Sequence, residues 1–267
     1  MIDPNPKVSG RGIEILRNAG TEVVTGVLEE EAKHLNEVFI HYITGKRPFV
    51  ILKTAMTLDG KIAAATGDSK WITGTLSREY VHKLRERVSA VLVGIRTVLA
   101  DDPSLTTRLE GRNGRNPVRI IVDSTGRIPL GCNVLNRTDN TRIIVASTSR
   151  MDTEKEAKLI NIGVEIIKSD GPDGKIDLAR LLEELHRQEL DSVLLEGGGT
   201  LNASALMNGL VDKVLVFIAP KIIGGAKAPT PVEGKGIRLM KDALSLENIH
   251  VSMCGTDILI EGYPKGG

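Results

Sequence analysis

The sequence predicts an α/β fold with a mostly parallel central sheet and an antiparallel edge. Short apolar runs alternate along the chain with stretches in which apolar residues recur at helical spacing. Most of these runs are apolar throughout, as in strands that are covered on both faces. The last stretch, NIHVSMCGTDILIEGY (248–263), has the pattern of a hairpin that turns at Gly255 and Thr256. Alternating strands and helices favour parallel pairing, and the hairpin supplies the antiparallel edge.

The first part of the chain predicts a helix, a strand and a second helix. They are expected over residues 12–20, 21–27 and 28–43. In the second helix the apolar residues fall on one stripe at helical spacing: Leu28, Ala32, Leu35, Phe39 and Ile43. The segment TGKRP (44–48) then indicates a boundary, and the apolar run FVILKTAM (49–56) opens a larger unit.

The larger unit is expected to alternate strands and helices up to the terminal hairpin. Strands are predicted at 49–56, 90–94, 118–123, 142–146, 163–167, 192–196 and 212–220. Helices are predicted at 76–88, 177–190 and 201–209. The segment 177–190 has a clear amphipathic pattern, because four leucines share one face: Leu178, Leu181, Leu182 and Leu185.

Composition and charge limit the classes of function. The 267 residues carry 35 Lys and Arg against 34 Asp and Glu, a net charge of +1, which argues against a general nucleic-acid binder. The two cysteines, Cys132 and Cys254, lack CxxC spacing, so neither a zinc site nor a disulfide framework is indicated. No apolar run has the length of a membrane span, and the start MIDPNPK has no signal-peptide pattern. We expect a folded protein in a reducing, cytoplasmic setting, without membrane or nucleic-acid partners.

Polar residues follow four of the predicted strands at the point where each strand ends. The segments after these strands are GDSKWITG (67–74), VGIRTVLADDPSLTTR (93–108), Ser124-Thr125-Gly126-Arg127 and Gly197-Gly198-Gly199-Thr200. In open α/β sheets, ligands collect at the carboxyl ends of the strands. The four segments therefore predict a ligand cleft along one rim of the sheet.

The glycine run between a strand and a helix predicts an anion site. In EGGGT (196–200), the absence of Cβ atoms lets backbone N–H groups approach an anion at the start of a helix, and a pyrophosphate would fit there. The alternative is a flexible surface loop, and the run does not match GxGxxG. Ser124, Thr125 and Arg127 are candidates for a 2′-phosphate, which would select NADPH over NADH; the alternative is a simple turn with hydroxyl caps.

Several charged residues have two possible interpretations. Arg85 and Arg108 could clamp a substrate phosphate, although an arginine on a helix is usually solvated. Lys53 interrupts an apolar strand, where a charge needs a partner or a pocket; the alternative is a lysine whose amine reaches water.

The remaining candidates are an acidic pair, a tryptophan and the histidines. Asp101 and Asp102 precede Pro103 and could simply end a helix. Trp71 could belong to the core or flank a planar ring. We expect the five histidines, which have no ligand spacing, to be structural: His34, His41, His82, His186 and His250.

Taken together, five stretches resemble the reductase domain of the bifunctional riboflavin-biosynthesis deaminase–reductase family. They follow the family's order over 47–263: KTAMTLDGKIAAATGDSKWITG (53–74), VGIRTVLADDPSLTTR (93–108), VRIIVDS (118–124), LLEGGGTLNASAL (194–206) and DKVLVFIAPKIIGG (212–225). The resemblance implies a dihydrofolate-reductase-like, three-layer α/β/α fold. It also implies NADPH-dependent reduction of 5-amino-6-(5-phosphoribosylamino)uracil to 5-amino-6-(5-phosphoribitylamino)uracil, by hydride transfer to ribose C1′.

The resemblance also implies roles for individual residues. Positions that match the family's NADP contacts are Ala55, Trp71, Thr97, Asp101, Ser124, Gly198, Gly199, Thr200, Leu201, Asn202, Ala203 and Ser204. Positions that match its substrate contacts are Ser69, Arg85, Leu105, Arg108 and Glu196, with the arginines on the ribose phosphate. Lys53 matches a lysine near the reacting ribose. Our hypothesis is that Lys53, Asp101 and Glu196 are catalytic: they position the open-chain sugar, orient the nicotinamide and assist proton transfer.

The N-terminal stretch resembles only the final part of the family's cytidine-deaminase-like domain. The zinc site of that domain needs HxE and PCxxC motifs, and neither occurs in this chain. We therefore expect residues 1–46 to be a remnant without deaminase activity or zinc, and residues 47–267 to form the reductase domain. Met1 could be a true start or internal to a longer protein.

Three other functions remain open at this stage. The chain could act on the 2,5-diaminopyrimidine before deamination, it could be a catalytically silent ligand-binding or assembly subunit, or it could reduce dihydrofolate. The apolar stripe of 28–43 needs cover, either from its own reductase domain or from a second subunit, and we expect a homodimer.

Overall fold

The computed structural model describes residues 1–5, 7–137 and 140–265. Over this range the strands form one nine-stranded sheet in the order β5-β4-β3-β2-β6-β1-β7-β9-β8. Their bounds are β1 Phe49–Thr57, β2 Ala90–Gly94, β3 Val118–Val122, β4 Ile143–Ser147, β5 Glu165–Lys168, β6 Ser192–Leu195, β7 Lys213–Ala219, β8 Leu246–Cys254 and β9 Asp257–Pro264. Strands β1 to β7 pair in parallel, whereas β9 pairs antiparallel to both β7 and β8. The predicted mostly parallel sheet with a terminal hairpin is confirmed.

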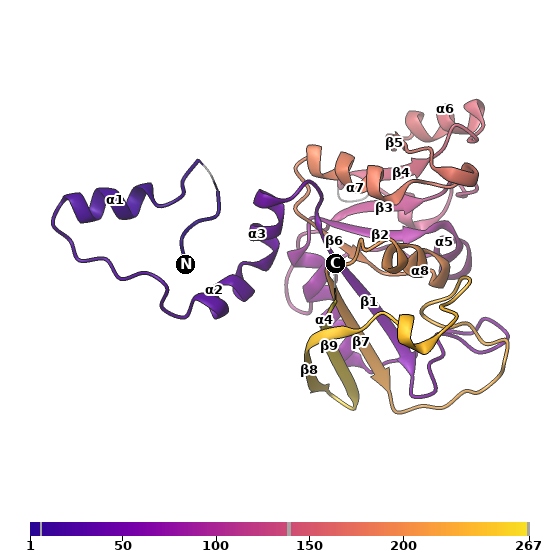
Figure 1. The fold of residues 1–267 in the computed structure, drawn as a ribbon. Coiled ribbons are helices and arrows are strands. Elements are labelled where there is room, and N and C mark those ends of the chain that lie inside the picture. The colour runs from indigo at the N-terminus through magenta and orange to yellow at the C-terminus, as the bar shows by residue number, and fades with distance from the viewer. Residues whose placement is uncertain (6, 138–139, 266–267) are drawn as a thin grey trace.

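Helices cover both faces of the sheet, which gives the expected three layers (Figure 1). They are α4 Thr75–Arg87, α5 Ile95–Asp101, α6 Thr153–Asn161, α7 Leu178–Arg187 and α8 Gly199–Met207, with short 3-10 turns η1 Asn133–Leu135, η2 Pro172–Gly174 and η3 Met240–Asp242. Successive residues of a strand point to opposite faces, so one strand serves two cores. In β2, Leu92 packs in the cluster that contains the leucines of α7, and Val93 packs in the cluster that contains Val98 of α5. The apolar sequence of the central strands follows from this double cover.

The first part of the chain differs from the prediction. It forms α1 Arg11–Asn18, α2 Glu29–Leu35 and α3 Glu37–Thr44, and no residue of these helices is buried. The strand predicted over 21–27 is absent from the structure, because a strand needs a neighbour for its backbone hydrogen bonds and no strand lies beside this segment. The single helix predicted over 28–43 is interrupted at Asn36. Its stripe is not covered by the chain itself, since the exposed fraction is 84% for Leu35 and 41% for Phe39.

Helix α3 is nevertheless fixed to the sheet. The carboxylate of Glu37 accepts hydrogen bonds from Lys213 in β7 at 2.9 Å and from the hydroxyl of Tyr263 in β9 at 2.6 Å. After α3, Arg47 donates to both carboxylate oxygens of Asp212, at 2.6 and 2.8 Å. Figure 1 shows α3 against the sheet, with α1 and α2 further out. The predicted boundary at residue 46 thus follows a helix that is bonded to the sheet; the boundary stays a prediction.

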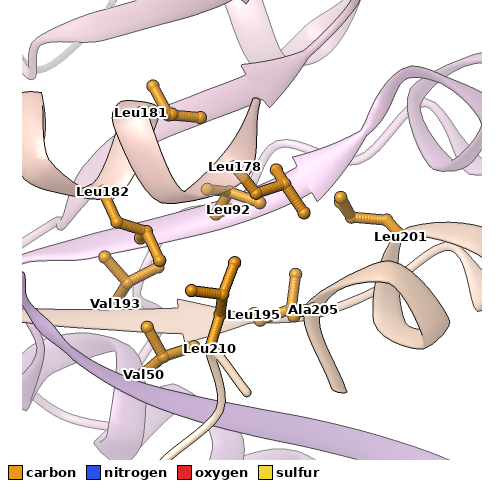
Figure 2. A pocket seen from close by; sticks show the side chains of 10 residues that line it. All are labelled: Val50, Leu92, Leu178, Leu181, Leu182, Val193, Leu195, Leu201, Ala205 and Leu210. Atoms are coloured by element: carbon orange, nitrogen blue, oxygen red, sulfur yellow. The ribbon is translucent and has the colours of Figure 1, made fainter. Parts of the chain in front are cut away.

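One small cavity lies between the sheet and the helices α7 and α8 (Figure 2). Its volume is about 20 Å³, and every side chain that lines it is apolar: Val50, Leu92, Leu178, Leu181, Leu182, Val193, Leu195, Leu201, Ala205 and Leu210. A space of this size holds one water at most, and a water there would find no polar partner. We therefore regard it as a packing defect of the core and not as a ligand site.

Replacing Leu185 of α7 by alanine tests how much this helix contributes to stability. Leu185 is fully buried against the sheet. Leu185→Ala should lower the free energy of unfolding by about 2–5 kcal/mol, because transfer and cavity terms add in a close-packed core. Glu183→Ala, on the exposed side of the same helix, should change it by less than about 0.5 kcal/mol. Urea denaturation measures both; similar small losses would mean that α7 packs loosely.

Candidate active site

A large cleft opens at the carboxyl ends of the parallel strands. Its volume is about 670 Å³, and β1, α4, the segment 93–108, the glycine run and residues 229–233 contribute to its walls. Fourteen of the predicted site residues line it: Lys53, Ala55, Ser69, Trp71, Arg85, Thr97, Asp101, Leu105, Arg108, Glu196, Gly198, Gly199, Thr200 and Asn202. The chain thus brings together residues that lie almost 150 positions apart.

Four other predicted cofactor residues do not line this cleft. Leu201 points into the apolar cavity of Figure 2, Ala203 lies on the buried side of α8, and Ser204 is exposed on the same helix. Ser124 follows β3, and its carbonyl oxygen accepts a hydrogen bond from the hydroxyl of Thr148 at 2.7 Å. Their assignment to the cofactor stays a prediction.

A buried ion-pair group lies in the cleft. The carboxylate of Glu196 accepts hydrogen bonds from Nε and Nη2 of Arg85, at 2.5 and 2.9 Å, and from Nζ of Lys53 at 3.3 Å. The side chain of Glu196 is only 6% exposed, and those of Arg85 and Lys53 are 12% and 14% exposed. Neither cation is therefore a solvated surface residue. This excludes the alternatives of a solvated Arg85 and of a Lys53 that extends to bulk water.

The local fold explains why these three side chains meet. Strands β1 and β6 pair in register with Leu52 opposite Leu195, so the next residues, Lys53 and Glu196, are neighbours at the end of the ladder. Arg85 comes from the last turn of α4, which covers this face of the sheet. Two positive charges therefore converge on one buried carboxylate.

The electrostatics of the group favour its fully charged form. Burial by itself raises the pKa of Glu196, but the charges of Arg85 and Lys53 and their hydrogen bonds outweigh it and hold that pKa at about 2. Burial lowers the pKa of Arg85, whereas the carboxylate of Glu196 raises it, and the net direction is upward. At neutral pH Glu196 is therefore an anion that fixes two cations in place.

The segment 101–108 forms one wall of the cleft. The hydroxyl of Ser69 donates to Oδ1 of Asp101 at 3.3 Å, which links this wall to the loop after β1. Nη1 of Arg85 donates to the carbonyl oxygen of Thr106 at 3.1 Å. Leu105 is 3% exposed and packs in the core below the wall. Asp101 and Arg108 both line the cleft, one near each end of this segment.

His82, which the sequence predicts to be structural, also lines the cleft. Its Nδ1 accepts the backbone N–H of Arg108 at 3.2 Å. Burial, followed by the nearby charges of Arg85 and Arg108, lowers the pKa of His82 to about 4, so the ring is neutral at pH 7. His82 and Arg85 are three residues apart on one helix and therefore lie on the same face. This spacing is the sequence signal that could have placed His82 in the site.

The glycine run forms a turn that leads directly into α8. Gly197 and Gly198 have φ values of 131° and 88°, which side-chain-bearing residues rarely adopt. The N–H of Gly94 donates to the carbonyl oxygen of Gly197 at 3.1 Å and ties the turn to β2. Asn202 in the first turn of α8 is 2% exposed, and its Oδ1 has no hydrogen-bond partner among the described residues. A helix start with an unpaired buried polar atom suits a bound polar ligand.

Residues outside the predicted set contact this turn. The backbone N–H of Glu233 donates to the carbonyl oxygen of Gly199 at 3.0 Å, and Thr200 donates to the carboxylate of Glu233 at 3.2 Å. Glu233 lies in an irregular segment without periodicity, so no sequence signal marks it. At the other side of the cleft, Trp71 is 63% exposed and lies under the guanidinium of Arg78, 4.7 Å from the ring centroid. Trp71 is therefore not a core residue.

The described part of the chain contains no group of three or more His, Cys, Asp or Glu side chains that could hold a metal ion. Within the same residues, no helix is both long enough and apolar enough to cross a membrane.

Comparison with known proteins decides the family. The model of the RibD C-terminal domain matches residues 48–260. The chain belongs to this family. It is 45% identical over 259 residues to the riboflavin biosynthesis protein RibD of Actinobacillus pleuropneumoniae, covering 97% of this chain and 68% of that protein.

Two further relatives have names that specify a reaction. One is the 2,5-diamino-6-ribosylamino-4(3H)-pyrimidinone 5′-phosphate reductase of Methanothermobacter thermautotrophicus, 45% identical over 221 residues, which covers 82% of this chain and all of that protein. The other is a solved structure from Thermotoga maritima, a diaminohydroxyphosphoribosylaminopyrimidine deaminase/5-amino-6-(5-phosphoribosylamino)uracil reductase. It has a TM-score of 0.81 and 41% identity over 98% of this chain and 69% of that one. Both names describe a reductase of a phosphorylated ribosylaminopyrimidine.

The charged state of Glu196 predicts a specific pH dependence of stability. Its pKa is depressed to about 2 in the folded protein from an ordinary value of 4.5. The stabilisation is therefore fully present above about pH 4.5 and is lost as the pH falls toward about 2. Over this range the wild type should lose about 3 kcal/mol of unfolding free energy relative to Glu196→Gln.

Urea denaturation at stepped pH measures this difference. Glu183→Gln, on the exposed side of α7, should keep the pH dependence of the wild type. Parallel curves for the wild type and Glu196→Gln would show that the carboxylate titrates near its ordinary pKa.

Proposed function

We propose that the protein reduces 5-amino-6-(5-phosphoribosylamino)uracil to 5-amino-6-(5-phosphoribitylamino)uracil with NADPH, as a step of riboflavin biosynthesis. The observation that carries the proposal is the buried group of Lys53, Glu196 and Arg85, which lies in one cleft with a glycine turn at a helix start. Membership of the RibD C-terminal domain family and the reductase names of the relatives support it.

The glycine turn and the residues around it fit a dinucleotide. The start of α8 offers backbone N–H groups to a pyrophosphate, and the unpaired Oδ1 of Asn202 can accept a hydrogen bond from a ligand. Ala55, Trp71, Thr97 and Asp101 line the same cleft and would hold the rest of the cofactor. When bound, a nicotinamide cofactor supplies the hydride for ribose C1′. Ser124, Thr125 and Arg127 are the proposed contacts of a 2′-phosphate that favours NADPH.

Arg108 is the better candidate for the main phosphate ligand of the substrate. A guanidinium has five N–H donors. In Arg85, three of them are already hydrogen-bonded, two to Glu196 and one to the carbonyl oxygen of Thr106. No such commitment is found for the Arg108 side chain in the described residues, and it lines the cleft. Because Nδ1 of neutral His82 accepts the N–H of Arg108, the ring hydrogen lies on Nε2, and His82 helps to hold Arg108 in place.

In this proposal Lys53 is the proton donor. Opening of the ribosylamine to an imine and reduction of that imine require a proton at the ring oxygen and at nitrogen. Glu196, with a pKa of about 2, has no proton to give at neutral pH. Its ion pair instead keeps the ammonium of Lys53 in place, where it can donate a proton to the sugar. Asp101 faces the same cleft, and we propose that it orients the nicotinamide and the open-chain sugar.

The proposal includes the expected cytoplasmic setting, a small-molecule substrate and a homodimer. What supports the homodimer is apolar surface that one chain leaves uncovered, on α2 and α3 and also on the edge strand β8. In β8, Ile249 and Val251 are each 58% exposed, and Met253 is 66% exposed.

The direct test is reduction by the purified chain. NADPH consumption is measured with the aminouracil substrate and with the 2,5-diaminopyrimidine that precedes it, and NADH is compared with NADPH. We expect turnover with NADPH and a higher kcat/KM for the aminouracil. The full-length match to the archaeal reductase makes the diaminopyrimidine the second candidate, and a higher kcat/KM for it would assign the earlier step. Absence of NADPH consumption with both would indicate a silent binding subunit and contradict the proposal.

Lys53→Ala tests the assignment of the proton donor. It should lower kcat by about 100-fold or more, the usual contribution of general acid catalysis. The dissociation constant of NADPH should change by less than about threefold, because the proposed cofactor contacts lie elsewhere in the cleft. Lys158→Ala, on the exposed face of α6, should leave both quantities unchanged. Equal losses of turnover and NADPH affinity would assign Lys53 to cofactor binding instead.

A further inference from the structure

The wall formed by residues 101–108 contains two unusual backbone conformations. Asp102 has a φ of 41° and Leu105 a φ of 53°, and neither residue is a glycine. Side-chain-bearing residues adopt this left-handed region infrequently, and for a leucine it is a conformation that the surroundings must hold. The wall carries Asp101, Leu105 and Arg108 of the proposed site, so whatever holds it also sets their geometry.

One residue outside the cleft holds the first half of this wall. The backbone N–H of Asn133 donates to Oδ1 of Asp102 at 2.8 Å. Its side-chain amide donates to Oδ2 of Asp102 at 2.8 Å and to the carbonyl oxygen of Asp102 at 3.2 Å. A single asparagine thus binds both carboxylate oxygens and the backbone of the residue that follows Asp101.

Asn133 is itself fixed to the core. It opens η1, whose next two residues, Val134 and Leu135, are 0% and 7% exposed. Arg119 in β3, which is 1% exposed, donates to the carbonyl oxygens of Val134 at 3.2 Å and Asn136 at 2.8 Å. A continuous series of bonds therefore runs from the sheet through η1 to Asp102.

The second half of the wall has other supports. Arg85 donates to the carbonyl oxygen of Thr106, and the N–H of Arg108 donates to His82. The N–H of Thr107 donates to Oδ1 of Asn116 at 2.6 Å. Loss of the Asn133 contacts should therefore move the end of α5 and Asp101, and leave Arg108 near its place.

We propose that Asn133 is a positioning residue for the reaction: it acts through Asp102 to hold Asp101 and the turn of the wall at Leu105. This inference rests on the proposed function, because its effect is read in the reduction. A displaced Asp101 should slow the chemical step more than it weakens binding of the sugar phosphate, since the phosphate contacts are held by the other half of the wall.

An exchange of the two side chains tests this inference. Asn133→Asp places a second carboxylate against that of Asp102, with almost no change of shape. It should lower kcat about tenfold and raise the KM of the sugar phosphate by less than about threefold. In the double variant Asp102→Asn/Asn133→Asp, the amide at position 102 can accept the backbone N–H of position 133 and donate to the new carboxylate. Its kcat should return to within about twofold of the wild type.

Two further variants complete the set. Asn133→Ala keeps the backbone N–H donor and removes only the side-chain bonds, so it should fold where Asn133→Asp does not, and it should lower kcat about threefold. Asn161→Asp, at the exposed end of α6, introduces the same change of charge away from the wall and should leave kcat and KM unchanged.

Amide hydrogen exchange of residues 101–105 is measured on the same proteins, as a readout that does not depend on activity. Exchange should be about tenfold faster or more in Asn133→Asp and normal in the double variant. The inference is overturned if the single variants keep the kcat and exchange of the wild type, or if the double variant stays as impaired as Asn133→Asp. An inactive wild type would contradict the proposed function, and the exchange data would then decide the inference by themselves.

Discussion

The buried carboxylate of Glu196 organises the cleft. Burying an unpaired charge costs several kcal/mol, so Glu196 is tolerated only because Arg85 and Lys53 come with it. The three elements that supply these residues must therefore be correctly placed: β1 and β6 side by side in register, and α4 with its last turn over them. Folding and formation of the site are therefore coupled, because the ion pairs can form only in the correctly assembled sheet.

The ion pairs of Glu196 also distinguish two of the arginines that line the cleft, Arg85 and Arg108. An arginine in a cleft is often a phosphate ligand, yet three of the five N–H donors of Arg85 are occupied by protein groups. Its guanidinium is therefore mainly structural, whereas no such bonds are found for the Arg108 side chain among the described residues, and Arg108 lines the cleft. Because Glu196 neutralises one of the cations, the cleft carries less positive charge than its arginines and lysines would give by themselves.

The sequence predicts the sheet well because every central strand is buried on both faces, and such a strand is apolar along its whole length. Prediction from the sequence is weakest where the secondary structure of a segment depends on which other segments pack beside it. The segment 21–27 has the pattern of a strand but no strand beside it, and the helix over 28–43 is interrupted at Asn36 although its stripe continues. In the site, Lys53 stands out because a charge interrupts an apolar run. Its partner Glu196 follows a strand that pairs with β1 only after folding. The bonds from Asn133 to Asp102 join a short 3-10 turn to the residue after α5, and neither has a periodic sequence pattern.

The attachment of α3 has a consequence for any module fused ahead of it. Glu37 and Arg47 bind at the beginnings of the parallel strands, whereas the cleft opens where those strands end. Lys53, the first residue of β1 that lines the cleft, lies four residues beyond Phe49, so the two places are only about 13 Å apart along the strand, at roughly 3.3 Å of rise per residue. A module fused ahead of α3 would therefore be held near the beginnings of the parallel strands, on the side of the sheet away from the mouth of the cleft.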